Sequence, residues 1–286
     1  MINKRTFSVR MKEYSRNPIS LILLLLVILA TLVTFGVIGY IIMHILVNGV
    51  PYLKPSLFAL EYNTTNVSLF PSFINTIIMT GISLLIAVPI GICTAIYLVE
   101  YANRGNRFVG LIRLTAETLS GIPSIVYGLF GMLFFVTTLK MGFSILSGAL
   151  TLSIMILPLI MRTTEEALKS VPDMYREASF GLGAGKLRTV FRIVLPSAVP
   201  GILAGMILAI GRIVGETAAL IYTAGTVAQI PDSVLGSGRT LSVHMYALSS
   251  EGLYTNQAYA TAVVLLILVV FINGLSSVVA KRLSKG

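Results

Sequence analysis

Two ionisable side chains lie inside a long apolar stretch of this 286-residue sequence. Arg212 and Glu216 are the only charged residues between positions 193 and 231. They are four residues apart, so a continuous helix would place them on one face. An Arg near the centre of a membrane helix costs about 2.5–3.5 kcal/mol and needs a partner or an aqueous cavity. We therefore predict that Arg212 and Glu216 pair and line a pathway, with a purely structural ion pair as the alternative.

Polar residues at the ends of other apolar stretches are further candidates. Arg162 directly follows an apolar stretch, where it either meets a solute leaving the pathway or anchors the helix end in the interface. Ser120 and Ser124 flank Pro123, and free amides in a helical turn that starts there could face an anion, with helix packing as the alternative. Glu117 is expected to pair with Arg113, four residues earlier.

Long apolar stretches must position these residues. The chain is 56% hydrophobic and 11% charged, too apolar for a soluble enzyme, since soluble domains carry roughly 25% charged residues. About 20 apolar residues at ~1.5 Å each cross a bilayer core ~30 Å thick. The sequence therefore predicts an all-α membrane protein, because no alternating strand pattern is present. The six predicted helical spans are residues 19–47, 70–99, 119–139, 143–161, 198–222 and 258–280.

The net charge of +10 reports topology rather than nucleic-acid binding. Of the 21 basic residues, 17 fall before the first span, after the last span or in the connections 104–113 and 162–192. Only Lys54, Lys140 and Arg239 lie in the other connections. The positive-inside rule then places both termini in the cytoplasm, with segments 1–18 and 281–286 flanking one domain over 19–280.

No cofactor or metal is expected. His44 and His244 are far apart, and Cys93 is the only cysteine, so these residues favour structural roles. The glycine-rich run 181–187 lacks the spacing of a P-loop, because Phe180 and Leu187 stand where Gly and Ser or Thr are required. The chain is therefore not expected to hydrolyse ATP.

The connection 162–197 predicts a structured hairpin. Residues 165–169 read as a short helix, Ser170 and Pro172 stop and restart the helix, and Gly183 ends the second one. Such a charged hairpin suits docking to a soluble partner, with adsorption to the membrane surface as the alternative.

Seven residues of this hairpin have a recognisable spacing: Glu177, Ala178, Ser179, Gly183, Ile193, Leu195 and Pro196. They resemble the EAA loop of ABC-importer permeases, with Ser179 in place of the second Ala. The resemblance implies the type I ABC-importer permease fold, in which this loop is the coupling helix that sits in a groove of a separate ATPase. We expect small residues to allow close approach and Arg176, Glu177 and Lys186 to satisfy polar groups at the rim.

Two further stretches, 117–128 and 211–220, resemble permeases of the Pst phosphate importer, and residues 162–166 resemble its A-type subunit more than its C-type subunit. This resemblance implies a heterodimer with a C-type permease, a homodimeric ATPase and a periplasmic or extracellular phosphate-binding protein. It also implies a bacterial or archaeal cell membrane. The chain itself is expected to be a transport subunit with no catalytic residue.

Phosphate suits the buried charges. The Arg212 guanidinium offers forked donors for two phosphate oxygens. Glu216 could accept a hydrogen bond from protonated phosphate, which sulfate cannot offer, and hold Arg212 when the path is empty. Another oxyanion or small polar solute is the nearest alternative cargo, and an ion-coupled transporter that works alone is an alternative class.

Overall fold

The computed structural model describes residues 18–103 and 105–283, and in these ranges the chain is helical with no strand. Most of the predicted segments 1–18 and 281–286 lies outside the described residues or their described side chains. In chain order the α-helices are α2 (Pro18–Gly49), α3 (Phe70–Ile96), α4 (Arg107–Ser120), α5 (Ser124–Gly131), α6 (Ile145–Lys169), α7 (Asp173–Gly181), α8 (Lys186–Thr189), α9 (Leu195–Val214), α10 (Ala218–Ile221), α11 (Leu241–Glu251) and α12 (Thr255–Leu283).

Short helical segments complete the chain. Two 3-10 helices, η1 (Val50–Tyr52) and η2 (Pro55–Phe58), follow α2. Three π-helical segments extend or join the longer helices: η3 (Tyr97–Tyr101) continues α3, η4 (Met132–Thr138) continues α5, and η5 (Val190–Val194) joins α8 to α9.

The predicted membrane spans are largely confirmed. Among the described residues, 5 helices are long and apolar enough to cross a membrane, and a bent pair of helices makes up to 6. Helices α2, α3, α6 and α12 match the first, second, fourth and sixth predicted spans.

The third span is broken. Helix α4 meets the α5–η4 helix at an angle of 103°. Pro123 causes the break, because it has no amide hydrogen to continue a helix and its own ψ of 141° is extended. The segment Ser124–Thr138 would be only ~22 Å long at ~1.5 Å per residue, so it cannot cross the bilayer core alone. The predicted straight span over residues 119–139 is therefore wrong, and Arg107–Ser120 together with Ser124–Thr138 forms either one broken span or a re-entrant loop.

The fifth span also differs from the prediction of residues 198–222. One long helical run extends from Lys186 to Val214 and includes α8, η5 and α9. It ends at Gly215, and the separate helix α10 begins at Ala218. The predicted short helix 165–169 is likewise wrong, because those residues form the last turns of α6.

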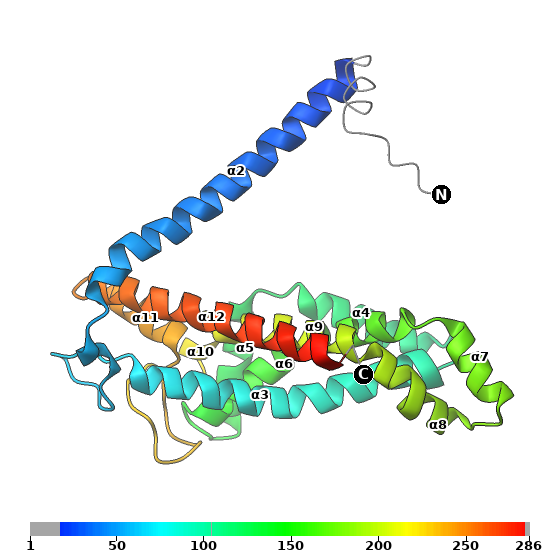
Figure 1. The fold of residues 1–286 in the computed structure, drawn as a ribbon. Coiled ribbons are helices and arrows are strands. Elements are labelled where there is room, and N and C mark those ends of the chain that lie inside the picture. The colour runs from blue at the N-terminus through cyan, green and yellow to red at the C-terminus, as the bar shows by residue number, and fades with distance from the viewer. Residues whose placement is uncertain (1–17, 104, 284–286) are drawn as a thin grey trace.

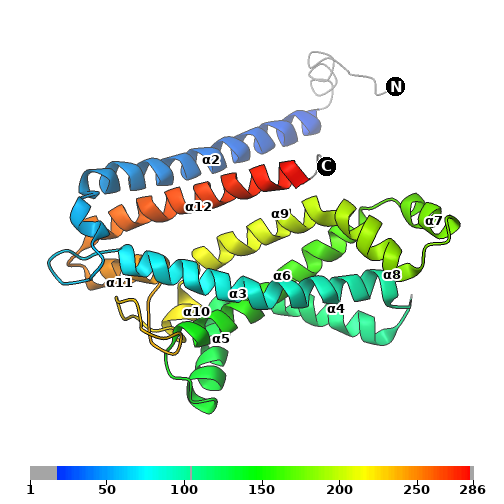
Figure 2. The same cartoon turned by 60° about the horizontal axis from the view of Figure 1, so that its bottom comes forward.

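The helices define two ends of the molecule (Figures 1 and 2). We call the end that carries α7 and α8 the hairpin end, and the opposite end, with η1, η2, α10 and α11, the loop end. The start of α2, the start of α4 and the end of α12 all lie toward the hairpin end (Figure 2). Figure 1 shows that the start of α2 nevertheless lies well away from the start of α4 and the end of α12.

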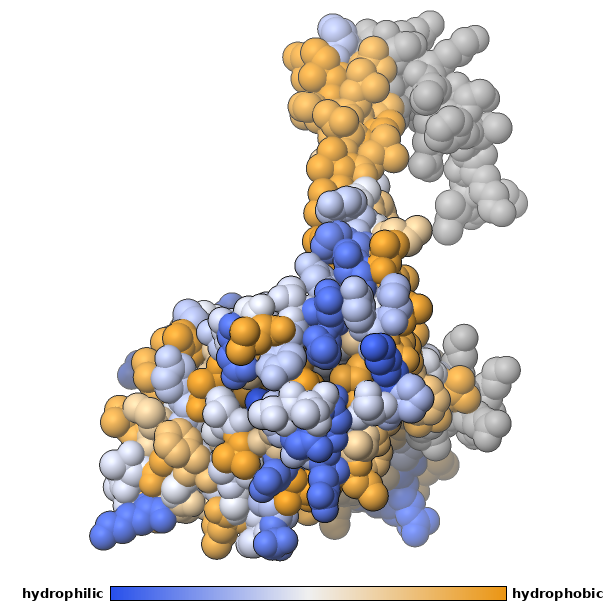
Figure 3. All heavy atoms as spheres, turned by 90° about the vertical axis from the view of Figure 1, so that its left-hand side faces the viewer, coloured by the Kyte–Doolittle hydropathy of each residue, from blue (hydrophilic) through white to orange (hydrophobic). Residues whose placement is uncertain are grey.

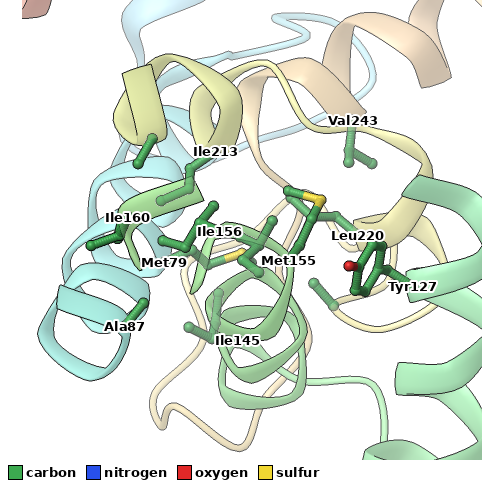
Figure 4. Packing of buried hydrophobic residues seen from close by; sticks show 13 residues of the cluster. Met79, Ala87, Tyr127, Ile145, Met155, Ile156, Ile160, Ile213, Leu220 and Val243 are labelled. Atoms are coloured by element: carbon green, nitrogen blue, oxygen red, sulfur yellow. The ribbon is translucent and has the colours of Figure 1, made fainter. Parts of the chain in front are cut away.

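A packed core joins α3, α5, α6, α9 and α10 (Figure 4). Met79, Ile156, Ile213 and Leu220 lie in this core and are at most 1% exposed. Lipid chains are as apolar as these side chains, so close packing rather than exclusion from water holds such helices together. Exposed apolar side chains cover α2, which forms an apolar column beside the mixed surface of the loop end (Figure 3).

Small residues bring α6 and α9 together. A Cβ atom on Gly201 would lie 2.7 Å from the Ala167 Cβ, and one on Gly205 would overlap the Thr163 hydroxyl. These two glycines therefore permit the close approach of the helices. Gly211 and Gly215 make no such contact, since a Cβ on Gly211 would meet nothing within 4 Å and one on Gly215 would approach only the backbone carbonyl of Gly211.

Candidate functional site

Arg212 and Glu216 do not form the predicted pair. Helix α9 ends at Val214, so the two residues no longer share a helical face. The Glu216 carboxylate instead accepts hydrogen bonds from the backbone amides of Thr217 and Ala219, at 3.2 Å and 3.1 Å. These amides open α10 and have no partner within that helix, so the carboxylate caps it.

Glu216 also joins two helices at the loop end. Its backbone carbonyl accepts a hydrogen bond from the Ser242 hydroxyl of α11. With its side chain buried and bonded to α10, Glu216 is held as a structural link between α9, α10 and α11. The expectation that it holds Arg212 in an empty path is wrong.

Arg212 occupies the last turn of α9, where the negative end of the helix dipole favours a cation. Its side chain is half-buried. At the break between α4 and α5, the Tyr127 hydroxyl of α5 donates a hydrogen bond of 2.7 Å to the carbonyl of Leu119. No ion pair found within residues 18–103 and 105–283 includes Arg212.

The two predicted serines lie at this break. The Ser120 hydroxyl donates to the carbonyl of Glu117 in its own helix, at 2.8 Å. Ser124 is the first residue of α5 and is half-buried. That these serines line a path stays a prediction, because no contact tests it.

A second charged group lies at the hairpin end. A hollow of about 230 Å³ there is lined by both acidic and basic side chains of α4 and α6. At its centre the Glu165 carboxylate, 8% exposed, contacts Arg113 at 2.8 Å and Lys169 at 2.6 Å. Arg113 therefore pairs with Glu165 across two helices, and the expected pairing with Glu117 is wrong.

Arg162 lies on the rim of the same hollow. Its Nε is 3.4 Å from the Glu166 carboxylate, and its side chain is 60% exposed. Arg162 stands toward the hairpin end of α6, whereas Arg212 stands at the opposite end of α9 (Figure 2). The structure thus separates the two arginines instead of bringing them into one site.

Glu165 is the residue that the sequence reasoning missed. Its spacing held a signal, because Arg162 and Glu166, and Glu165 and Lys169, form two interleaved pairs four residues apart on one helix. The contact with Arg113 had no such signal, since it joins residues 52 positions apart in separate helices.

The hairpin of α7 and α8 has the predicted outline. Pro172 precedes α7, and Gly183 follows it with a φ of +80°, a conformation that favours glycine. Glu177 and Ala178 are exposed. Large apolar side chains are exposed as well, which leaves an unpartnered apolar surface on the hairpin. They are Met174, Tyr175, Phe180, Leu182, Leu187 and Phe191.

Two of the hairpin residues face inward instead of outward. Ser179 is 3% exposed, and its hydroxyl lies 2.8 Å from the Thr189 hydroxyl, so it closes the hairpin rather than offering a surface to a partner. Arg176 has a side chain only 14% exposed and contacts Glu100, so its predicted place at the rim is wrong. Lys186 lies 5.1 Å over the Tyr101 ring.

The rest of the motif lies at the start of the fifth span. Ile193 belongs to η5, and Leu195 and Pro196 begin α9. They form the hairpin-end turn of one continuous helical run from Lys186 to Val214. Pro196 is exposed at the first turn of α9, where a missing amide hydrogen costs no helical bond.

A buried aromatic and cationic cluster closes the loop end. The Arg239 guanidinium lies 4.9 Å from the Tyr62 ring centroid, and His244 meets the same ring at an edge. Burial lowers the pKa of Arg239. Burial and the neighbouring Arg239 charge lower the pKa of His244 to about 3, so this imidazole is neutral at physiological pH.

The sequence matches a known family. The profile described as "Binding-protein-dependent transport system inner membrane component" matches residues 87–285. The chain belongs to this family. It is therefore a multi-pass membrane permease subunit, and the match covers the α4–α5 break, the hairpin and α9.

Curated relatives extend the likeness. The permease is 35% identical over 230 residues to the probable ABC transporter permease protein YqgI of Bacillus subtilis, a match that covers 73% of this chain and 76% of YqgI. It is 43% identical over 150 residues to the phosphate transport system permease protein PstA 1 of Mycobacterium tuberculosis, covering 52% of this chain and 48% of that protein. The chain thus matches about half the length of PstA 1.

Solved structures share the fold of this permease. A chain of the bacterial alginate ABC transporter in complex with its periplasmic protein superposes with a TM-score of 0.69 at 17% identity, covering 96% of this chain and 98% of that chain. A chain of the MetNI methionine ABC transporter gives 0.59 at 19% identity, covering 75% and 94%. At these identities the likeness shows the ABC-importer permease fold and nothing of the cargo.

Proposed function

We propose that this permease is the A-type membrane subunit of an ATP-driven phosphate importer. The observation that carries the proposal is its 43% identity to a phosphate transport permease over the 150 residues matched. The related Mycobacterium leprae phosphate permease is 36% identical over 201 residues and covers 69% of this chain. The basic side chains along the helices supply the chemistry that an anionic cargo requires.

Arg212 is the proposed binding group in the path. Because Glu216 is engaged with α10, no carboxylate of the described chain neutralises Arg212. Its forked donors match two phosphate oxygens and keep their charge at physiological pH. Arg162, beside Glu165 and Glu166, is the proposed second contact, where phosphate leaves at the hairpin end.

The hairpin end is proposed to face the cytoplasm. There the exposed apolar face of α7 would dock into one subunit of a homodimeric ATPase, which would hydrolyse ATP. A C-type permease would supply the other half of the path, and a phosphate-binding protein would deliver cargo at the loop end. The complex would reside in a bacterial or archaeal cell membrane with both termini of this chain cytoplasmic.

Phosphate uptake by the reconstituted complex tests this function. Proteoliposomes that contain this chain, the C-type permease and the ATPase should take up phosphate when the binding protein and ATP are present. The Arg212→Gln variant should reduce uptake at least ~10-fold, since it removes a charge-assisted bidentate contact. Lys140→Gln, in an external turn, is the matched control and should leave uptake unchanged.

Two results would overturn the proposal. Equal competition by sulfate and phosphate would show a less selective oxyanion permease. Transport by liposomes that contain this chain alone would show an ion-coupled transporter. Unchanged uptake in Arg212→Gln would remove Arg212 from the path.

A further inference from the structure

One π-helical turn contacts both limbs of the hairpin. This turn, η3, is the hairpin end of α3. Its Glu100 contacts Arg176 of α7, and its Tyr101 lies beneath the ammonium group of Lys186, the first residue of α8. Single π-helical turns inside α-helices are often placed at functional positions, because the extra residue turns side chains out of the regular helical register.

Arg176 has all the bonds that a buried guanidinium requires. Its Nε and Nη2 donate to Glu100 Oε1 at 3.1 Å and 2.7 Å. Its Nη2 also donates to the carbonyl of Leu168 at 3.0 Å, and its Nη1 donates to the carbonyl of Val171 at 2.8 Å. The same Nη1 contacts the Asp173 carboxylate at 3.2 Å.

These bonds connect three elements through one side chain. Leu168 lies in the last turn of α6, Val171 lies in the turn before α7, and Glu100 belongs to the extension of α3. The side chains of Glu100 and Arg176 are 8% and 14% exposed, so the pair is shielded from salt and water. A lysine could not make the same set of contacts, because its ammonium is a single point rather than a planar fork.

The hairpin itself is closed as a unit. The Ser179 and Thr189 hydroxyls join α7 to α8, and Thr189 Oγ1 also donates to the carbonyl of Gly185 at 3.2 Å. Apolar residues of η3, α6, η5 and α9 form a common cluster behind it, which includes Leu98, Leu168 and Val194. A displacement of α7 therefore reaches α3 through the Arg176 fork while the hairpin keeps its shape.

We propose that Arg176 is a positioning residue that transmits movement of the hairpin to α3 by clamping α7 to Glu100 of the η3 turn. The clamp works in addition to the direct helical continuity between the hairpin and α9. Displacement of the hairpin would then move α3 and α9 together, on both sides of α6. This inference rests on the proposed coupling to an ATPase.

The stoichiometry of the reconstituted complex tests the clamp. In Arg176→Lys and Glu100→Gln, subunit assembly and ATP hydrolysis should persist, whereas phosphate taken up per ATP hydrolysed should fall at least ~5-fold, because coupling rather than binding is weakened. Arg107→Lys is the matched control, since this exposed arginine lines the same hollow of about 680 Å³ as Arg176. Uptake per ATP within about two-fold of the native ratio in both variants would overturn the clamp.

A second measurement needs no ATPase and separates this inference from the proposed function. Hydrogen exchange of the full-length permease in nanodiscs should show the α7 amides of Arg176→Lys exchanging ~10-fold faster, with the α12 amides unchanged, because only the local attachment is lost. Unchanged α7 exchange would overturn the clamp even if the native complex transports phosphate. Faster α7 exchange beside a native complex that fails to transport phosphate would support the clamp and reject the proposed function.

Discussion

Arg176 and Arg239 are both buried arginines, one at each end of the molecule, and they are held by different interactions. Arg176 at the hairpin end donates to a carboxylate on another helix and to two backbone carbonyls. Arg239 at the loop end lies over an aromatic ring, donates weakly to the carbonyl of Thr226 at 3.5 Å, and leaves its Nε and Nη2 without a partner among the described residues.

The difference shows how each end resists change. An ion pair joins helices that are far apart in the sequence, and removing one partner leaves the other as a buried charge without a counter-charge. Removing a cation from an aromatic ring leaves only a neutral ring behind. The hairpin end is therefore expected to behave as a rigid coupled unit, and the loop end as a set of neutral contacts around one buried charge.

Replacing each arginine in turn tests this difference between the two ends with the largest expected effect. Arg176→Met leaves Glu100 buried without a counter-charge and should lower the free energy of unfolding by about 4 kcal/mol. Arg239→Met removes a buried charge that lacks a carboxylate, so the loss should be only ~1 kcal/mol. Unfolding of the purified permease by SDS titration measures both. Equal losses in the two variants would show that the two ends are held alike.

Two glycines of α9 test how tightly this helix is packed at two positions along its length. Gly205→Val should cost about 3 kcal/mol, because its side chain overlaps Thr163. Thr163 cannot yield freely, since its hydroxyl donates to the carbonyl of Leu159 at 2.9 Å. Gly211→Ala, toward the loop end, meets nothing within 4 Å and should stabilise the helix by ~0.5–1 kcal/mol. The same titration decides, and a neutral Gly205→Val would contradict the tight α6–α9 contact.

Acid should weaken the loop end alone. His244 has a pKa of about 3 in the fold and one near 6.5 when unfolded, so between these values only the unfolded chain binds the proton. Stability is full above pH ~6.5 and should fall by about 2 kcal/mol between pH 7.5 and pH 5. His244→Gln should remove that part of the pH dependence, and His44→Gln should keep it. Equal pH dependence in native protein and His244→Gln would show that His244 takes no part in acid destabilisation.

Several features of this protein follow from the sequence because they depend on neighbours in the chain. The spans can be recognised in the sequence because each must contain about 20 apolar residues and must form its backbone hydrogen bonds internally. The hairpin can be predicted because Pro172 and Gly183 start and end a helix through their own backbone conformations. The motif spacing from Glu177 to Pro196 also lies in one segment, so it indicates the permease family without any tertiary contact.

The surroundings of Arg212 could be predicted only in part. The sequence correctly places Arg212 in an apolar helix. The predicted pairing with Glu216 assumed that this helix continues past residue 214, where α9 ends. Gly215 ends α9, and the carboxylate then satisfies backbone amides of α10, which have no other partner within that helix. Because the helix ends between Arg212 and Glu216, their four-residue spacing does not place them on one helical face.

Composition, spacing and chain order by themselves determined the membrane class and the location of the hairpin. Only the tertiary structure decided which charges meet: Glu165 with Arg113, and Glu100 with Arg176, 76 residues apart. The physical reason is the separation along the chain over which each interaction acts. Helix formation and capping are set within a few residues, whereas a buried ion pair depends on where separate helices pack.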